Sequence, residues 1–189
     1  MYSAQAGHIL AFHGCDSTVA SRVIAGDDRL SESRNTYDWL GNGIYFWEND
    51  VERALQWAAQ SRRVDSPGVV GVVLDLGHCL NLLNAACIEE VGAANELLDE
   101  HVWTDGVERP SNRSGGSATD PLIRDLDCTV IETLHELRAD EGFDPYQSVR
   151  GMFPKGEELY PGAGFRSKNH IQICVCDVSC IKGYFHPLG

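Results

Sequence analysis

The stretch Gly41-Asn42-Gly43-Ile44-Tyr45-Phe46-Trp47 carries more information about this chain than any other. Its two glycines tolerate positive φ angles and let the backbone approach a neighbouring group closely, because neither has a side chain. Tyr45 then leaves the turn on an apolar run, where its ring can form a flat wall while its hydroxyl keeps a polar partner. The stretch predicts either a ligand-binding turn or an ordinary β-turn that leads into a buried strand.

The composition suits one globular domain over residues 1–189, with 43% hydrophobic residues. A formal net charge of −13 argues against bulk electrostatic binding to nucleic acid or anionic membranes, because such binding needs a basic face. No apolar run is long enough to span a membrane, and the first residues lack the basic start and apolar core of a signal peptide. We therefore expect a cytoplasmic protein with no membrane partner.

Seven cysteines are scattered through apolar segments, which favours reduced, buried thiols over a disulfide framework. Cys174, Cys176 and Cys180 lie close together in sequence, but no His or Cys pair elsewhere has the spacing of a zinc finger. We expect no metal.

Short apolar and β-branched runs predict the strands, and capping residues predict the helices. Asp16, Ser17 and Thr18 supply cap oxygens for a helix closed by Gly26, and Asn49 is expected to cap the next one. Expected strands are 8–15, 44–47, 68–76, 147–153, 170–177 and 183–185, and expected helices are 19–25, a segment from 49 onward, 84–100, and 122–138, the last opened by Asp120 and Pro121. Residues 27–42 are expected to form a surface loop, and 105–119 a mobile loop.

This order of elements predicts a mixed α+β domain. It lacks the steady strand–helix alternation of a doubly wound sheet. The glycine turn also lacks the phosphate-binding fingerprint of a dinucleotide fold.

Three motifs in a fixed order carry a resemblance to a known family. They are His13-Gly14-Cys15, the turn that ends in Tyr45 with a helix behind it, and a late strand with an inward polar residue. Together they resemble the catalytic domain of poly(ADP-ribose) polymerase-type, diphtheria-toxin-like ADP-ribosyltransferases. The match covers residues 8–60 well and 165–185 moderately, and 80–145 do not align. The resemblance implies a split antiparallel β-sheet core with flanking helices, and NAD+ as co-substrate.

The resemblance also implies roles for individual residues. His13 would bind the ribose on the adenosine side of NAD+, although a lone histidine is more often a core residue. Gly14 would offer its backbone to the nicotinamide amide, and Tyr45 would stack on the nicotinamide ring. A second aromatic would face Tyr45 from the following helix, with Trp57 preferred over Trp47. The NAD+-binding set that follows is His13, Gly14, Cys15, Gly43, Tyr45, Arg53 and Trp57.

The chain departs from the family at three places, one of which is Trp47, where the family often keeps a small residue. The family often has a glutamate where Gln172 stands, and a serine in the helix where Arg53 or Ala54 stands. A carboxylate beside the ribose stabilises the positive charge that develops as nicotinamide leaves. Glutamine can hydrogen-bond the ribose hydroxyl but cannot ionise at neutral pH. We therefore expect transfer of a single ADP-ribose rather than polymer growth, with His13, Tyr45 and Gln172 as the catalytic triad.

Activity without that glutamate needs an intrinsically nucleophilic acceptor or another base. Glu157 and Glu158 lie on the loop that touches the acceptor in the resembled family, so Glu158 is a candidate base and Glu157 a candidate acceptor contact. The favoured alternative is that both are solvated loop charges, because surface carboxylates are common without any special role. Arg150 and Arg166 are candidate cations for the acceptor, and for Arg150 a structural salt bridge is the alternative.

The expected function is mono-ADP-ribosyl transfer from NAD+ to a macromolecular acceptor, either protein or an RNA or DNA base, with release of nicotinamide. The alternatives are an NAD+ glycohydrolase and a non-catalytic module that binds NAD+ or ADP-ribose. Compact relatives without targeting signals often serve as bacterial toxins or defence effectors. A toxin–antitoxin or antiviral role, with an antitoxin or inhibitor protein as partner, is therefore part of the expectation.

Overall fold

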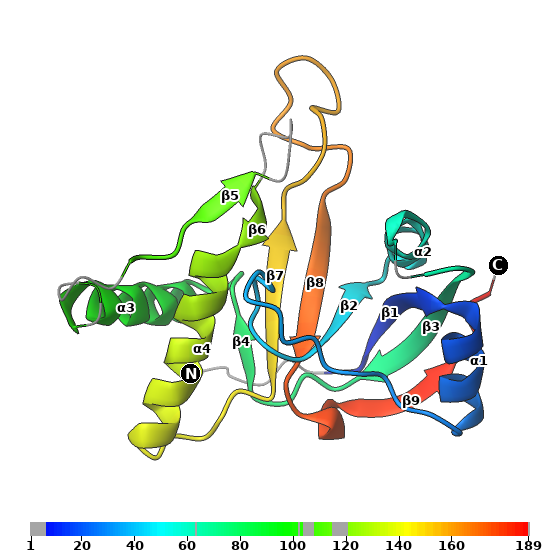
Figure 1. Cartoon of the computed structure of the whole chain (residues 1–189), viewed down its shortest axis with the longest axis horizontal. Helices are drawn as coiled ribbons and strands as arrows, with labels where there is room; N and C mark the ends of the chain where they lie inside the picture. The colour runs from blue at the N-terminus through cyan, green and yellow to red at the C-terminus, as the bar shows by residue number, and fades with distance from the viewer. Residues whose placement is uncertain (1–6, 63, 102, 104–107, 115–120, 189) are drawn as a thin grey trace.

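One mixed sheet of seven strands organises the molecule (Figure 1). The computed structural model describes residues 7–62, 64–101, 103, 108–114 and 121–188. The strand order is β4-β7-β8-β2-β1-β3-β9, and only the pairing of β4 with β7 is parallel. The strands are β1 (Ile9–Asp16), β2 (Ile44–Glu48), β3 (Pro67–Leu74), β4 (Cys79–Asn81), β7 (Ser148–Phe153), β8 (His170–Val175) and β9 (Ile181–Phe185). The predicted α+β class is therefore confirmed.

Four helices flank the sheet: α1 (Ser17–Ala25), α2 (Val51–Gln60), α3 (Ala85–His101) and α4 (Asp125–Asp140). Helix α1 has the predicted caps, since Asp16 accepts a hydrogen bond from the Thr18 N–H at 2.9 Å and Gly26 ends the helix with φ 84°. The predicted cap of α2 is wrong by one residue. Asp50 accepts from the Arg53 N–H at 2.9 Å, whereas Asn49 adopts φ 51° at the corner between β2 and α2.

The region before α4 differs from the prediction. Residues Pro121–Arg124 form β6, which pairs with β5 (Asn112–Ser114) in a separate two-stranded sheet, so α4 starts later than expected. The expected loop 105–119 therefore contains a strand, while 105–107 and 115–119, like the expected cap Asp120, lie outside the described residues. Cross-strand pairing overrode a polar composition that sequence reasoning associates with loops.

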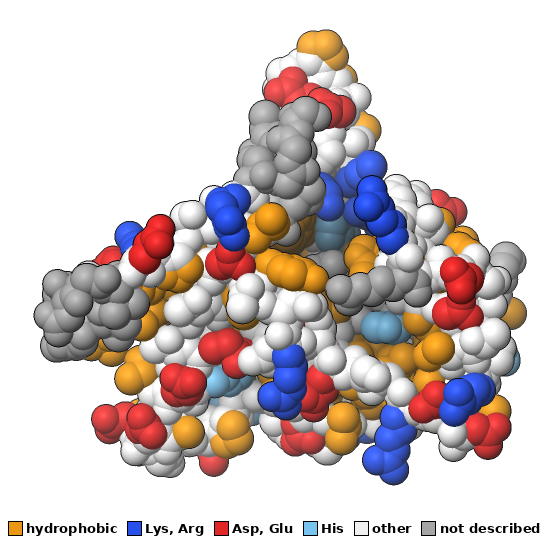
Figure 2. All heavy atoms as spheres, viewed as in Figure 1, with side chains coloured by type: hydrophobic (Ala, Val, Ile, Leu, Met, Phe, Trp, Pro, Cys, Tyr) orange, Lys and Arg blue, Asp and Glu red, His pale blue; other side chains and the backbone are white. Residues whose placement is uncertain are grey.

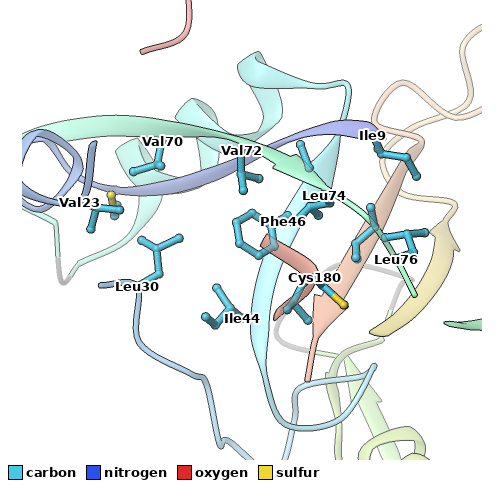
Figure 3. Close-up of a cluster of buried hydrophobic side chains, with 14 of the residues drawn as sticks. Ile9, Val23, Leu30, Ile44, Phe46, Val70, Val72, Leu74, Leu76 and Cys180 are labelled. Atoms are coloured by element: carbon cyan, nitrogen blue, oxygen red, sulfur yellow. The ribbon is translucent and has the colours of Figure 1, made fainter. Parts of the chain in front are cut away.

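Two hydrophobic clusters cover opposite faces of the sheet. The first, drawn in Figure 3, contains Phe46 of β2, Val70, Val72 and Leu74 of β3, and Val23 of α1. The second lies where α3 and α4 meet β7 and β8, and includes Leu40, Val149 and Cys174. Helix α2 covers β1 and β3 on the face opposite α1. On the face covered by α2, the middle of the sheet is formed by β2 and β8. Residues of these two strands on that face therefore lie between α2 and the layer of α3 and α4.

All seven cysteines are free thiols, five of them buried. Within the described residues no cluster of His, Cys, Asp or Glu suits a metal ion. None of the described helices is both long and apolar enough to cross a bilayer.

Candidate active site

Strands β1 and β2 diverge at the centre of the sheet. They pair only at Ala11↔Glu48 and Phe12↔Trp47, although β1 continues to Asp16 and β2 begins at Ile44. On its other side β1 pairs with β3 through all eight of its residues. The sheet is therefore continuous but opens locally between the second half of β1 and the first half of β2.

The backbone of Gly14 is directed into this split. The Leu10 carbonyl accepts a hydrogen bond from the Asn49 N–H at 2.9 Å, so Leu10 turns its backbone groups toward β2. Backbone groups of an antiparallel strand point to alternate sides, and Gly14 has the same phase as Leu10. A Cβ on Gly14 would lie 2.1 Å from the Ala54 carbonyl oxygen, so glycine is also what admits α2 to this place.

The His13 ring bridges the split. Its Nδ1 lies 2.8 Å from the Tyr45 carbonyl oxygen, and its ring meets Phe46 edge-on with centroids 5.8 Å apart. A carbonyl can only accept, so Nδ1 carries the proton and Nε2 of the neutral ring is left as an acceptor. Burial lowers the pKa of His13 below 6.5, although its bond to Tyr45 opposes that shift. Nε2 of the neutral ring can therefore accept a hydrogen bond from a ligand hydroxyl.

The Tyr45 hydroxyl is fully engaged by the glycine turn. It donates to the Gly41 carbonyl at 2.8 Å and accepts from the Leu40 N–H at 2.9 Å. Burial raises the pKa of this phenol well above its ordinary value, so it stays neutral. What Tyr45 can offer to a ligand is therefore its ring, and not an ionised or donor hydroxyl.

The two glycines of the turn approach protein rather than open space. A Cβ on Gly43 would lie 2.5 Å from the Val175 carbonyl oxygen, and one on Gly41 would lie 2.5 Å from the Glu132 carboxylate. Both glycines also have positive φ, 155° at Gly43 and 81° at Gly41. The turn therefore needs glycine at both positions in order to pack on β8 and α4, and the expected contact of Gly43 with a ligand stays a prediction.

Gln172 lies at the middle of the sheet, paired with Trp47 of β2 on one side and Gly151 of β7 on the other. Its Oε1 accepts a hydrogen bond from Trp39 Nε1 at 2.7 Å. His13 belongs to the neighbouring row of the sheet, so its Cβ points to the opposite face from that of Gln172. The three triad positions thus meet around β2 and the split, and do not share one face.

Two buried donors lack partners between β2 and α2. Trp47 Nε1 and Arg53 Nε have no hydrogen-bond partner among the described residues. The Trp47 ring lies 5.8 Å from that of Trp57, which is one helical turn beyond Arg53. Trp57 is 49% exposed and Trp47 only 5%, so the preferred aromatic is the accessible one. Because both orphaned atoms are donors, a group bound there would have to present oxygen acceptors, which an amide carbonyl or a phosphate does.

Several predicted residues lie elsewhere. Cys15 faces the core, and burial raises the pKa of its thiol to about 11. Arg150 is 9% exposed and forms a two-pronged ion pair with Glu48, with N–O distances of 2.6 and 2.9 Å. It lies in the row of Ile173, on the face opposite Gln172. The structural salt bridge that was the alternative for Arg150 is the arrangement found.

The remaining predicted residues lie on the arm, residues 154–169, which joins β7 to β8 and projects from the body (Figure 1). Glu157, Glu158 and Arg166 are all exposed there. Glu158 accepts a hydrogen bond from the Gly162 N–H at 2.9 Å, which stabilises the turn of the arm. Figure 2 shows lysine and arginine side chains grouped where the arm joins the body.

Sequence reasoning missed Trp39, Glu132 and Glu48 as residues that shape the site. Glu132 of α4 accepts a hydrogen bond from the Asn42 N–H at 2.7 Å and so anchors the glycine turn to α4. For Trp39 the sequence offered a signal, because it is a large aromatic residue in a mostly polar loop. Comparison with known protein families, curated proteins and solved structures finds no match to this chain.

Proposed function

We propose that this protein is a mono-ADP-ribosyltransferase that moves ADP-ribose from NAD+ to a macromolecular acceptor, a protein or an RNA or DNA base. The observation that carries the proposal is the split between β1 and β2. Around it are an acceptor nitrogen on His13, backbone groups of Gly14, and the ring of Tyr45. These are the groups that the resembled family uses to hold NAD+.

The divergence of the strands suits a long ligand. His13 lies on one face of the sheet and Gln172 on the other, and both are close to the split. A dinucleotide bound along the split would place its adenosine ribose at His13 and its nicotinamide ribose near Gln172. The orphaned donors on Trp47 and Arg53 would then find oxygen acceptors in the ligand.

In the reaction the bond between the ribose C1′ and the nicotinamide nitrogen breaks, and its electron pair leaves with nicotinamide. The acceptor's nucleophile forms the new bond at C1′ and gives up a proton to a base or to water. Gln172 can orient the ribose through a hydrogen bond but cannot take up that proton. Transfer would therefore depend on an acceptor that is itself nucleophilic, which favours one ADP-ribose per site over a polymer.

A second candidate is an NAD+-binding module without transfer, or one that hydrolyses NAD+ slowly to ADP-ribose and nicotinamide. The observation that favours it is the amide at position 172, already hydrogen-bonded to Trp39. A role as a cytoplasmic toxin or antiviral effector held by an antitoxin partner belongs with the transfer proposal. Growth arrest on expression, lost in His13→Ala, would support such a role.

Labelled NAD+ incubated with a cell extract separates these functions. Label that protease removes indicates a protein acceptor, and label that nuclease removes indicates a nucleic acid. Free ADP-ribose alone indicates hydrolysis, and binding without turnover indicates a module. His13→Ala should abolish labelling. Gln172→Glu should raise the rate of nicotinamide release if the ribose lies beside this position, and an unchanged rate would count against that placement.

A further inference from the structure

Trp39 lies directly against Gln172, from a loop far away in sequence. Its indole Nε1 donates to Gln172 Oε1 at 2.7 Å, and both side chains are half-buried. The loop that carries Trp39 is fixed on both sides of it. Leu40 is fully buried, and Asp38 accepts a hydrogen bond from the Asn35 N–H at 2.9 Å. The contact therefore joins two well-anchored segments.

Strand β7 is shaped to admit this indole. Gly151 is the register partner of Gln172, and a Cβ at Gly151 would lie 2.8 Å from the Trp39 ring. Phe153 meets the indole edge-on at 4.7 Å, and the Arg124 guanidinium lies 5.3 Å from the centre of the same ring. The ring thus has little freedom to turn away from Gln172.

The chemistry of the two groups fixes which end of the amide faces the indole. An indole N–H can only donate, so the carbonyl oxygen of Gln172 must face Trp39. Its NH2 group is then turned away from Trp39, with hydrogens that can be donated to another group. We propose that Trp39 is a positioning residue, which orients the Gln172 amide so that Nε2 donates to a ribose hydroxyl of the bound ligand. This inference rests on the proposed NAD+ site.

The proposal distinguishes glutamine from glutamate at this position. An amide has two different ends, and the wrong orientation would present an acceptor oxygen where a donor is needed. A carboxylate has two equivalent oxygens, so no orienting partner is required to choose between them. Trp39 should therefore matter in the natural chain and matter much less in a Gln172→Glu background.

A double-mutant cycle on nicotinamide release tests this difference. Trp39→Phe keeps most of the ring and removes the donor, and we expect it to lower kcat about tenfold while KM for NAD+ stays within about twofold. In the Gln172→Glu background the same change should lower kcat less than about twofold. Trp103→Phe, remote from Gln172, is the matched control. Equal losses in both backgrounds, or no loss in either, would overturn the positioning role.

The indole N–H signals in a ¹H–¹⁵N spectrum test the contact without any activity. Trp39→Phe assigns the Trp39 signal, and Gln172→Met should shift it upfield because the hydrogen bond is lost. Trp103 should keep its signal in both variants. If the unmodified protein releases no nicotinamide, the transfer proposal fails and this spectrum alone decides the Trp39–Gln172 contact. An unshifted Trp39 signal in Gln172→Met would refute it.

Discussion

Strand β1 has two neighbouring strands, β3 and β2, and the extent of its pairing with them differs greatly. It pairs with β3 through eight residues but with β2 at only two positions, after which the His13 side chain spans the gap to the Tyr45 carbonyl. Along β3 the ladder satisfies the backbone and buries valine side chains. Along β2 part of that ladder is given up, and backbone groups become available for a ligand. One strand therefore serves as scaffold on one side and, under the proposed function, contributes to the NAD+ site on the other.

The largest expected effect on stability comes from truncating Phe46, which packs in the first hydrophobic cluster and against His13 at the split. Phe46 is fully buried in the first cluster and lies edge-on to the His13 ring. Phe46→Ala should lower the free energy of unfolding by about 4 kcal/mol, because it leaves a large cavity. Urea unfolding measures this loss. Leu10→Ala, at a half-exposed position of β1, should change it by less than about 1 kcal/mol, and a loss as large as that of Phe46→Ala would contradict the contrast.

The next effect concerns the ion pair that ties β2 to β7 across β8. Glu48 is one of the two β2 residues paired with β1, and its carboxylate and the Arg150 side chain are 13% and 10% exposed. Glu48→Gln should destabilise the fold by about 3 kcal/mol, because it leaves a buried cation uncompensated. Replacing both residues by Met should restore most of that stability in urea unfolding. If the double variant is no more stable than Glu48→Gln, an uncompensated buried charge does not explain the loss of stability.

Gly14→Ala tests whether the split between β1 and β2 binds a ligand. Its Cβ would meet the Ala54 carbonyl oxygen, so α2 must move. We expect a loss of about 2 kcal/mol in unfolding free energy together with a loss of NAD+ affinity measured by calorimetry. Gly183→Ala in β9 is the matched control, since an added Cβ there meets nothing within 4 Å. Unchanged NAD+ affinity in a folded Gly14→Ala protein would argue against a ligand at the split.

His13→Ala should have a smaller effect on stability. Loss of the bond to the Tyr45 carbonyl lowers the free energy of unfolding by about 1 kcal/mol. The same change should reduce NAD+ affinity much more than it reduces stability. His78→Ala is a suitable control, because its ring binds the Pro145 carbonyl far from the split in sequence. Equal NAD+ affinities in His13→Ala and His78→Ala would show that His13 does not contribute to NAD+ binding.

The smallest effect is a pH dependence. Burial lowers the pKa of His13 below 6.5, so the unfolded chain takes up this proton before the folded protein does. The unfolding free energy should therefore fall as the pH drops below 6.5 toward the folded pKa. His170 contributes in the same direction, because burial lowers its pKa too. Urea unfolding at about pH 7.5 and about pH 5.5 measures the slope, which should be shallower in His13→Ala.

Local signals in the sequence predicted the parts of the fold that short-range interactions determine. The Asp16 and Gly26 caps of α1 and the valine-rich strand β3 were confirmed. The stretch before α4 was wrong, because its strand forms through pairing with a partner that no local pattern identifies. The α2 cap was displaced from Asn49 to Asp50, since the corner after β2 needs a left-handed residue.

The sequence predicted that the candidate site residues lie near one another, but it did not predict what surrounds them. His13, Gly14, Tyr45 and Gln172 do lie around β2 and the split. The glycine turn was given a ligand contact, but whether a glycine faces ligand or protein depends on what packs above it. The Arg150–Glu48 pair is separated by 102 residues and the Trp39–Gln172 contact by 133, distances over which no spacing rule operates.

The bond from Glu132 to the glycine turn has a practical consequence for engineering. Helix α4 lies in the part of the chain that does not align with the resembled family, yet it supports Asn42 and borders a cavity of about 380 Å³ beside the same loop. A chimera that takes the strands from this protein and its helical layer from another would lose that support. Residues 27–48 and 125–140 should therefore be exchanged together in such a chimera.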